Sequence, residues 1–425
     1  MLAQASHPLL NIGDTAMIGR LGAEALAARA IGAALMGSVY WIFSFLTFGT
    51  TSLVGRHYGA RDAKACGETL LHALFLALTG GLVVSAAGAW LAAPLYGLMG
   101  AQPAVAEPGI AYFRMVISSA PLTLLIYAST GFLRGIQNTK LPMVIAFVIA
   151  IVHLSLDYVL IYGNFGLPAL GLLGAAAAAW LAQLVGAVVY LGLFLFAPQF
   201  AQYRAIDWRL TRVSLRPLFS IGRELAIRTG ALRLSLVFVT AIAARMGAAT
   251  LAAYEIVFQL FMLCSDVVDG LAIAGQALAA KYLGANKEER AYRMGMTLIV
   301  AGFVTGLIFA AGFAAAWDFI VPFFTNNTEV LSLLTGGLIL LVCGIQPFNG
   351  IVFVLDGLLI GARDTRYLMW AMLAGAFGCL LPIAGSALLF DWALNGLLIG
   401  IGALMSWRCL TNVSRFLGRK WAAQS

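Results

Sequence analysis

The segment RLGAEALAARAI, residues 20–31, returns as RMGAATLAAYEI at residues 245–256, an offset of 225. Further along, TGFLRGIQNTKLPM from residue 130 matches DGLLIGARDTRYLM from residue 356 at an offset of 226. Chance similarity between apolar helices is common, but matched loop residues at one nearly constant offset over more than a hundred positions are hard to obtain by chance. We therefore interpret the chain as two related halves.

The composition places both halves in lipid. Of 425 residues, 62% are hydrophobic and 10% are charged, and the mean hydropathy is +0.93. Soluble domains carry about a quarter charged residues, so a chain this apolar cannot cover a surface that faces water. The five cysteines lie far apart and form no CxxC pair, and we therefore expect neither a disulfide framework, nor a metal site, nor a cofactor.

Twelve apolar segments are each long enough for a membrane-spanning helix, which needs about 20 residues. These segments lie at roughly 1–19, 26–55, 67–97, 104–133, 141–163, 170–198, 225–244, 251–280, 292–316, 330–361, 367–390 and 394–414. They are continuously apolar and lack the period-two alternation of membrane β-barrel strands. The sequence therefore predicts an all-α polytopic membrane protein with about twelve transmembrane helices.

The basic residues set the orientation of these helices. Of the 26 Lys and Arg residues, only Arg20 and Arg245 fall in outside loops if the N-terminus is cytoplasmic, and Arg29, Arg114 and Arg233 fall within or at the ends of spans. The remaining 21 lie on the cytoplasmic side, as the positive-inside rule requires. Both termini are therefore expected in the cytoplasm. The net charge of +8 reflects membrane topology, and we expect no nucleic-acid partner.

The repeat also predicts the domain organisation. We expect a six-helix bundle over residues 1–198, a cytoplasmic linker with a partly amphipathic helix over 199–222, and a second six-helix bundle over 223–425. Halves with an even number of spans start on the same side of the membrane, which relates them by a pseudo-two-fold axis along the membrane normal. Two bundles around a central cleft are typical of an alternating-access carrier, whereas a channel is more often built from several identical subunits. We therefore expect a carrier that acts as a monomer.

Six acidic residues fall inside the predicted spans, where a charge costs at least a few kcal/mol and should face a cavity or a partner. They are Asp14, Asp157, Glu255, Asp266, Asp269 and Asp356. Each is a candidate functional residue, and the alternative for each is a polar contact that holds helices together.

Asp14 and Asp157 are the strongest of these candidates. Asp14 lies six residues before Arg20, and Asp157 lies seven residues before Asn164, which places both about 9–10 Å below the outer boundary of the membrane. Two carboxylates at one depth in one bundle can meet across a cavity. Because close carboxylates cannot both ionise cheaply, the pair is expected to hold a proton near neutral pH.

The helical neighbours of the two carboxylates support a proton or substrate site. His7 and Asn11 share a helix face with Asp14, and His153 shares a face with Asp157 at a spacing of four residues. Histidine titrates near physiological pH. We take Asn11 and His153 as further candidates, and His7 as a residue of the membrane interface.

The second half carries secondary candidates. Glu255 and Gln259 share a helix face, and Asp266, eleven residues after Glu255, returns close to it. Asp356 lies seven residues before Arg363, near the cytoplasmic end of its span, where an ion pair or helix-end contact is favoured over a central site.

Several motifs resemble the multidrug and toxic compound extrusion (MATE) family over nearly the whole chain. They are DTAMIGRLGAEALAA from Asp14, GARD from Gly59, FLRGIQNTKLP from Phe132, LDYVLIYG from Leu156 and QPFNGIVFVLDGLLIGARD from Gln346. The last is most similar to the DNA-damage-inducible (DinF-type) branch. The resemblance implies a protein of the bacterial cytoplasmic (inner) membrane that exports cationic or amphipathic small molecules, driven by inward movement of protons or sodium ions.

The resemblance also implies roles for particular residues. Acidic residues on the family's first and fifth helices form a cation site, and they match Asp14 and Asp157. The family usually has asparagine at the position of His153. In its sodium-coupled branch, the tenth helix carries an acid where this chain has Asn349, and the seventh helix carries another, which residues 225–240 lack. These differences favour proton coupling over sodium coupling.

Two other function classes compare differently with the sequence. A lipid-linked oligosaccharide flippase of the same superfamily would use basic residues in its cavity to hold pyrophosphate, and the embedded Arg29, Arg114 and Arg233 leave this alternative open. A membrane-embedded enzyme is not expected, because the chain has no HExxH, GxSxG, Walker A or cysteine–histidine set.

The beginning of the chain differs from the repeat. With the offset of 225, Met1 lies opposite Ala226, so the counterpart of the basic stretch 214–223 would precede Met1. No Lys or Arg precedes Arg20. We expect a chain that starts late and lacks about ten or more residues of a cytoplasmic N-terminal segment.

Overall fold

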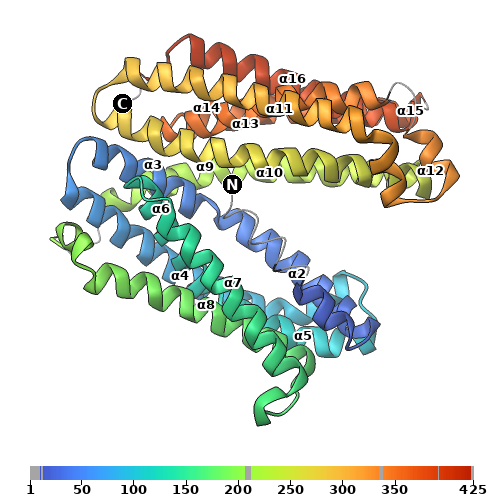
Figure 1. Ribbon diagram of the computed structural model, residues 1–425, viewed down its shortest axis with the longest axis horizontal. Coiled ribbons are helices and arrows are strands. Elements are labelled where there is room, and N and C mark those ends of the chain that lie inside the picture. The colour runs from blue at the N-terminus through green and yellow to red at the C-terminus, as the bar shows by residue number, and fades with distance from the viewer. Residues whose placement is uncertain (1–9, 11–12, 206–211, 335–337, 391, 423–425) are drawn as a thin grey trace. The chain divides into compact units, whose positions relative to one another are not determined.

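The computed structural model describes residues 10, 13–205, 212–334, 338–390 and 392–422, and every regular element within these ranges is a helix. The chain divides into two compact units, Leu2–Gly222 and Arg223–Ser425. In Figure 1 the helices of the first unit are blue to green, and those of the second are yellow-green to red.

The first unit begins with helical residues 13–19. It continues through α2 (Ala23–Phe43), α3 (Phe45–Gly59), α4 (Ala63–Leu98), α5 (Pro103–Ile117), α6 (Ala120–Gly135), α7 (Lys140–Tyr162), α8 (Gly171–Phe196) and the short 3-10 helix Pro198–Tyr203. Two of the predicted spans are broken helices. Ala23–Gly59 is interrupted at Ser44, and α5 and α6 meet at an angle of 43°. At the second break the hydroxyls of Ser118 and Ser119 donate to carbonyls of the preceding turn, a contact that bends helices.

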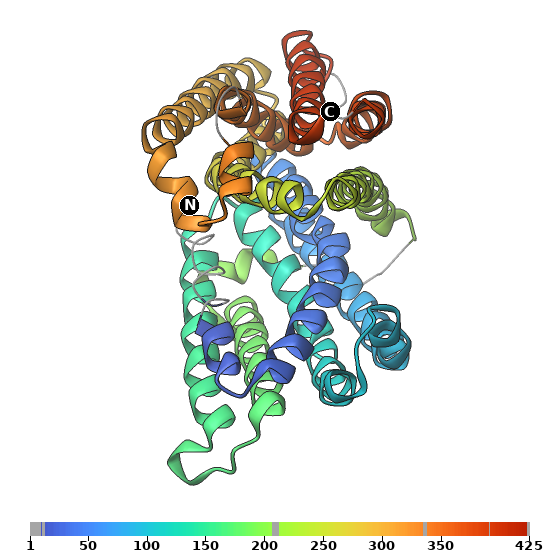
Figure 2. The same cartoon turned by 90° about the vertical axis from the view of Figure 1, so that its right-hand side faces the viewer.

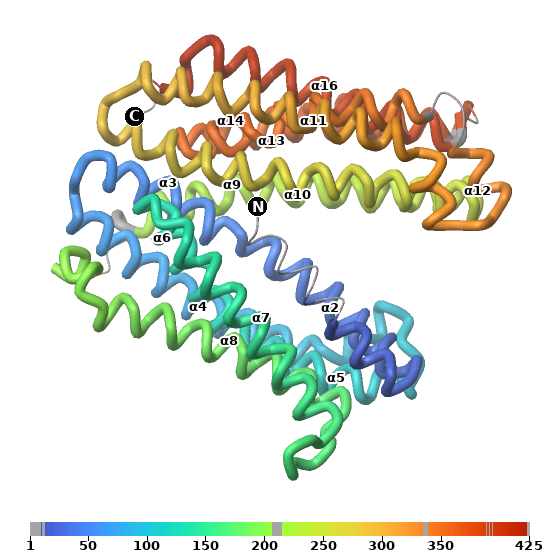
Figure 3. Tube along the Cα trace, in the orientation of Figure 1, coloured from blue at the N-terminus to red at the C-terminus, as the bar shows by residue number. Residues whose placement is uncertain are grey.

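The second unit is also built from long helices. Its elements are α9 (Arg212–Arg245), which begins in the last residues of the first unit, α10 (Ala248–Gly284), α11 (Glu288–Phe324), α12 (Thr328–Leu333), α13 (Leu338–Gly361), α14 (Thr365–Gly375), the π-helical turn Ala376–Leu380, α15 (Leu381–Leu389) and α16 (Ala393–Leu417). The chain path of both units can be followed in Figure 3.

The described residues hold ten helices that are long and apolar enough to cross a membrane, and the bent α5–α6 pair makes eleven. Six of the eleven are in the second unit and five in the first. The predicted first span, residues 1–19, is helical over 13–19, and most of its remaining residues lie outside the described ranges. The all-α polytopic fold predicted from the sequence is thus confirmed.

The internal repeat is visible in the backbone turns. Gly22 and Gly247, 225 residues apart, precede α2 and α10 with φ values of 120° and 123°. The α3–α4 and α10–α11 turns place Arg61 and Asn286 at φ values of 60° and 54°. In both turns the residue after this one donates its N–H five residues back along the chain, at 2.9 and 2.8 Å. Because positive φ is uncommon outside glycine, matching occurrences at one offset support a duplicated fold.

Long helices pack side by side within each unit. α7 and α8 contact each other along much of their length, and the pair stays adjacent in the views of Figures 1 and 2. In the second unit α13 packs between α10 and α11, with which it makes extensive contacts. Neither α7 nor α13 is broken, which gives each unit a continuous helix against which its neighbours pack.

Small residues bring α11 and α13 together. A β-carbon added at Gly302 of α11 would lie 2.6 Å from the carbonyl oxygen of Gly350 in α13, and one added at Gly350 would overlap the carbonyl of Gly302. Backbones that touch in this way are typical of membrane helices, where glycine permits close van der Waals packing.

This contact makes a testable prediction for stability. We expect Gly350→Val to destabilise the protein by about 1–3 kcal/mol, because the larger side chain forces α11 and α13 apart. Thermal unfolding in detergent micelles measures the effect. Gly312→Val is the matched control, since a β-carbon at Gly312 meets nothing within 4 Å. Equal unfolding temperatures for the two variants would contradict the predicted role of the contact.

Candidate functional site

Asp14 forms a buried ion pair with Arg29. Asp14 is on the helical segment 13–19 and Arg29 is on α2. Nε and Nη2 of Arg29 donate to Oδ2 of Asp14 at 2.9 and 2.6 Å, and Nη1 donates to Oγ1 of Thr15 at 2.9 Å. Only 10–11% of either side chain is exposed. The three contacts anchor the guanidinium to a single turn of the first helix.

The first helix packs against α7, which carries Asp157. A β-carbon at Gly13 would lie 2.7 Å from Leu154 of α7. One to two turns further on, the Tyr162 hydroxyl donates to the carbonyl of Met17 at 2.9 Å. Asp157 lies between these two contacts in α7. Asp14 and Asp157 are therefore at a similar level on neighbouring helices, as their distances from the outer boundary predicted.

Asp157 is buried, and no described residue donates a hydrogen bond to it. Its side chain is 0% exposed, and neither carboxylate oxygen accepts a hydrogen bond from a described residue. The nearest basic group is His153, whose Nε2 is 3.6 Å from Oδ2 of Asp157, beyond normal hydrogen-bond length. Asp14 and Arg29 lie within electrostatic range of Asp157. A carboxylate in this position needs a proton or a cation to offset its burial.

A buried tyrosine of the first unit lies beside the same region. Tyr112 of α5 is buried and lies within electrostatic range of Asp14, Arg29 and Asp157. Its ring packs against Gly32 of α2, where a β-carbon would lie 3.0 Å from it. The buried ring of Tyr112 helps to exclude water, which lowers the local dielectric constant and strengthens the electrostatic interactions at the site.

Of the other residues predicted for this site, the structure describes only His153. His153 is mostly buried and faces Asp157, with 12% of its side chain exposed. Asn11 and His7 lie outside the described residues.

The secondary candidates on α10 do not form a cluster of contacts with one another. Glu255, Gln259 and Asp266 are all exposed on one face of this helix. Asn349, on α13, is fully buried, and its amide nitrogen donates to the Ser265 hydroxyl at 3.0 Å.

Asp356 is the centre of a buried ion-pair cluster near the end of α13. Its Oδ2 accepts hydrogen bonds from Arg228 of α9 and Arg408 of α16, and its Oδ1 accepts one from Asn412 of α16 at 3.0 Å. Arg408 and Asn412 are 4% and 2% exposed. The carboxylate thus joins three helices of the second unit, and it is a structural centre in this conformation.

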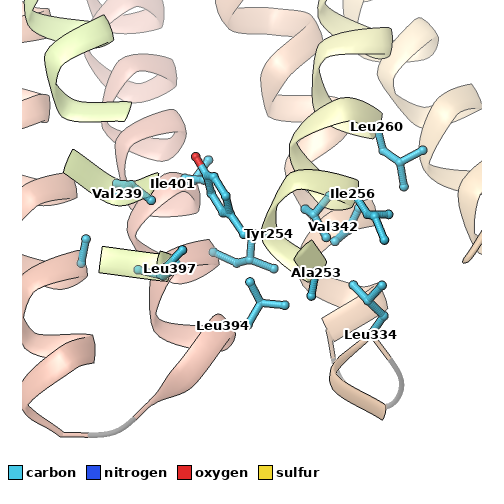
Figure 4. Close-up of a cluster of buried hydrophobic side chains, with 14 of the residues drawn as sticks. Val239, Ala253, Tyr254, Ile256, Leu260, Leu334, Val342, Leu394, Leu397 and Ile401 are labelled. Carbon is cyan, nitrogen blue, oxygen red and sulfur yellow. The ribbon is translucent and has the colours of Figure 1, made fainter. Parts of the chain in front are cut away.

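The sequence alone does not identify the partner of Asp14, although it places Arg29 inside a span. The repeat contained a usable signal. With the offset of 225, Asp14 aligns with Val239 and Arg29 aligns with Tyr254. Both counterparts belong to one buried hydrophobic cluster of the second unit, and Figure 4 shows the Tyr254 ring projecting from α10 toward Val239 and Ile401. Two positions that lie in one hydrophobic cluster in the second half are occupied by an acid and a base in the first half.

The cavity beside Tyr254 is small and apolar. It measures about 20 Å³, room for roughly one water molecule, and Phe258, Phe261 and Ile401 are among the side chains that line it. Nothing in this cavity resembles the charged arrangement around Asp14. Within the described residues, the buried acid–base pair at this repeat position belongs to the first unit alone.

The fold defines the chain as a polytopic helical membrane protein built from two related halves. The MatE family model matches residues 1–159 and 231–384, about three quarters of the chain. The chain therefore belongs to the MatE family of membrane transporters.

Individual relatives cover most of the chain. DNA damage-inducible protein F of Escherichia coli (strain K12) is 27% identical over 386 residues, which cover 88% of this chain and 81% of that protein. Multidrug resistance protein PmpM of Pseudomonas aeruginosa is 24% identical, with 92% and 82% covered. A crystal structure of MATE in the bent conformation aligns with a TM-score of 0.87 at 20% identity, over 100% of this chain and 93% of that one. The resemblance to the DNA-damage-inducible branch that the motifs indicated is confirmed by the first of these relatives.

Proposed function

We propose that the chain is a secondary active antiporter that exports cationic or amphipathic small molecules by alternating access, coupled to proton influx at the Asp14–Asp157 site. The observation that carries this proposal is the fully buried Asp157 carboxylate, which accepts no hydrogen bond from a described residue. Such a group is stable when it is protonated or bound to a cation, and unstable when it is bare. Competition of a proton and an organic cation for one carboxylate is the elementary step of cation–proton exchange.

The relatives support the direction and the substrate class. PmpM is described as a multidrug resistance protein, and a relative from Photorhabdus laumondii that is 26% identical is described as the probable multidrug resistance protein NorM. Resistance to several drugs is the property these names state for those proteins, and export from the cell would produce it. We extend it to this chain because the site offers acidic side chains in an aromatic, low-dielectric surrounding, which suits organic cations.

Two alternatives are disfavoured by contacts at the site. A sodium ion at Oδ1 of Asp14 would be repelled by the guanidinium of Arg29, which binds Oδ2 of the same carboxylate. A lipid-linked oligosaccharide flippase would need free basic groups for a pyrophosphate. Arg29, the embedded arginine at the candidate site, is committed to Asp14 and Thr15.

Transport by the purified protein in liposomes tests the proposed function. With ethidium as a monovalent fluorescent probe, we expect an imposed proton gradient to drive uptake into liposomes with an acidic lumen. A sodium gradient of the same size at equal pH should drive none. Protein-free liposomes give the passive rate. Uptake driven only by the sodium gradient would overturn the proton assignment, and uptake driven by neither would overturn the antiporter assignment for this cation.

A further inference from the structure

Arg29 makes the two carboxylates of the site unequal. Asp14 has a guanidinium bound through two N–H groups, whereas among the described residues Asp157 has no basic group closer than the imidazole at 3.6 Å. A proton on Asp14 would leave the positive charge of Arg29 without a counter-ion, and an unpaired buried charge is strongly unfavourable. A proton on Asp157 removes an unpaired buried charge, which is favourable. The two groups therefore respond to a proton in opposite ways.

We propose that Arg29 is a built-in counter-cation that keeps Asp14 ionised through the transport cycle, so that Asp157 alone exchanges its proton for the substrate and one proton enters per monovalent cation exported. This inference rests on the proposed function and assigns its stoichiometry. Arg29 binds Oδ2 of Asp14 and neutralises its charge, while Oδ1 accepts no hydrogen bond from a described residue. A second proton or a second positive charge at Asp14 would therefore leave the site with an uncompensated positive charge. The substrate class that follows is the organic monocation.

The charged and titratable groups that face the exchange site come from four described elements. Asp14 is on the first helix, Arg29 on α2, Tyr112 on α5, and His153 and Asp157 on α7. The charges of Arg29 and Asp14 cancel each other, and a neutral tyrosine and a neutral imidazole add none. The net charge of the set is then minus one when Asp157 is ionised and zero when it is protonated. Exchange of one proton for one monocation thus returns the site to the same net charge.

The asymmetry between the two halves supports a role specific to this site. The repeat counterparts of Asp14 and Arg29 are Val239 and Tyr254, which pack in an apolar cluster. Helices at this position therefore pack well without an ion pair. Because replacing a buried ion pair by apolar residues is often neutral or stabilising, stability alone does not account for the charged pair in the first half.

The ratio of protons to cations tests the proposal. Liposomes with an acidic lumen are loaded with ethidium until uptake stops, with the membrane potential clamped to zero by potassium and valinomycin. At this balance, one proton per cation gives about a tenfold ethidium gradient per pH unit, and two protons per cation give about a hundredfold gradient. We expect the tenfold gradient for the wild type and for Asp14→Asn/Arg29→Gln, which removes both charges together.

Single substitutions separate this proposal from a purely structural ion pair. Arg29→Gln frees Asp14 to titrate, and its gradient should rise toward the hundredfold value. Asp14→Asn leaves Arg29 unpaired and should slow transport, and the double variant should regain a faster rate than this single variant. A structural pair would change rate and stability in these variants and leave the ratio unchanged.

The outcomes are distinguishable from failure of the proposed function. A hundredfold gradient in the wild type would overturn the one-proton assignment while leaving proton-driven export intact. Loss of all proton-driven uptake in Asp14→Asn/Arg29→Gln, with folding verified by its unfolding temperature, would also overturn it, since Asp14 would then be a necessary proton carrier. Absence of uptake by the wild type would overturn the antiporter assignment itself, and this inference with it.

Discussion

Replacement of Asp157 by asparagine is expected to abolish proton-driven export. The asparagine amide is nearly the same size as the protonated carboxyl group, and it has no proton to exchange. The variant is therefore held in the equivalent of the protonated state and cannot take up the cation in its place. We expect ethidium uptake under a proton gradient to fall to the level of protein-free liposomes.

The same substitution should leave the fold intact. The Asp157 oxygens accept no hydrogen bond from the described part of the chain, so the amide costs no hydrogen bond and removes a group that is unfavourable when charged. The unfolding temperature near neutral pH should be equal to or above that of the wild type. Asp318→Asn is the matched control, because Asp318 is an exposed aspartate on α11 and should keep full transport. Normal export by Asp157→Asn would show that the site does not couple protons.

Replacement of Asp356 by alanine is expected to be the most destabilising single change among the charged residues. It would leave Arg228 and Arg408 without the carboxylate to which both donate, and Arg408 is 4% exposed. Removing one partner of a buried ion pair costs about 3–5 kcal/mol. We expect a large fall in the unfolding temperature measured in detergent micelles, together with reduced yield of folded protein.

An exposed ion pair provides the comparison for Asp356. Glu289 contacts Arg293 at 3.1 Å and Arg419 at 3.0 Å, and these side chains are about half exposed or more. Exposed pairs contribute little to stability, so Glu289→Ala should unfold close to the wild-type temperature. If Asp356→Ala behaved like Glu289→Ala, the buried cluster would not be what joins α9, α13 and α16.

Much of the fold was predictable because lipid imposes simple constraints on the sequence. Apolar length located the spans, and matched loops at an offset of 225 located the two halves. The breaks within spans were harder to predict, because composition does not report local geometry. The predicted span 367–390, for example, contains the π-helical turn Ala376–Leu380, followed by Pro382 in the first turn of α15. Proline lacks the N–H of a regular helix and clashes with the preceding turn, which accounts for the irregular segment.

The candidate site was predictable only in part. The depths of Asp14 and Asp157 follow from counting residues along two helices, and the structure places the two on neighbouring helices. The pairing of Asp14 with Arg29 depends on how α2 rotates and packs, and no spacing along the chain specifies that. The repeat offered an indirect signal. Asp14 and Arg29 are charged, whereas the residues aligned with them in the other half belong to a hydrophobic cluster. The coupling roles of Asp14, Asp157, His153 and Asn11 remain predictions.

Proton release on cation binding tests the central claim most directly. When ethidium is added to the purified protein in weakly buffered detergent solution, a pH-sensitive dye records any proton that leaves the site. We predict release of protons from the wild type in proportion to bound ethidium, and none from Asp157→Asn. Ethidium binding to the wild type without proton release, or equal release from the variant, would contradict the claim that proton and substrate compete for Asp157.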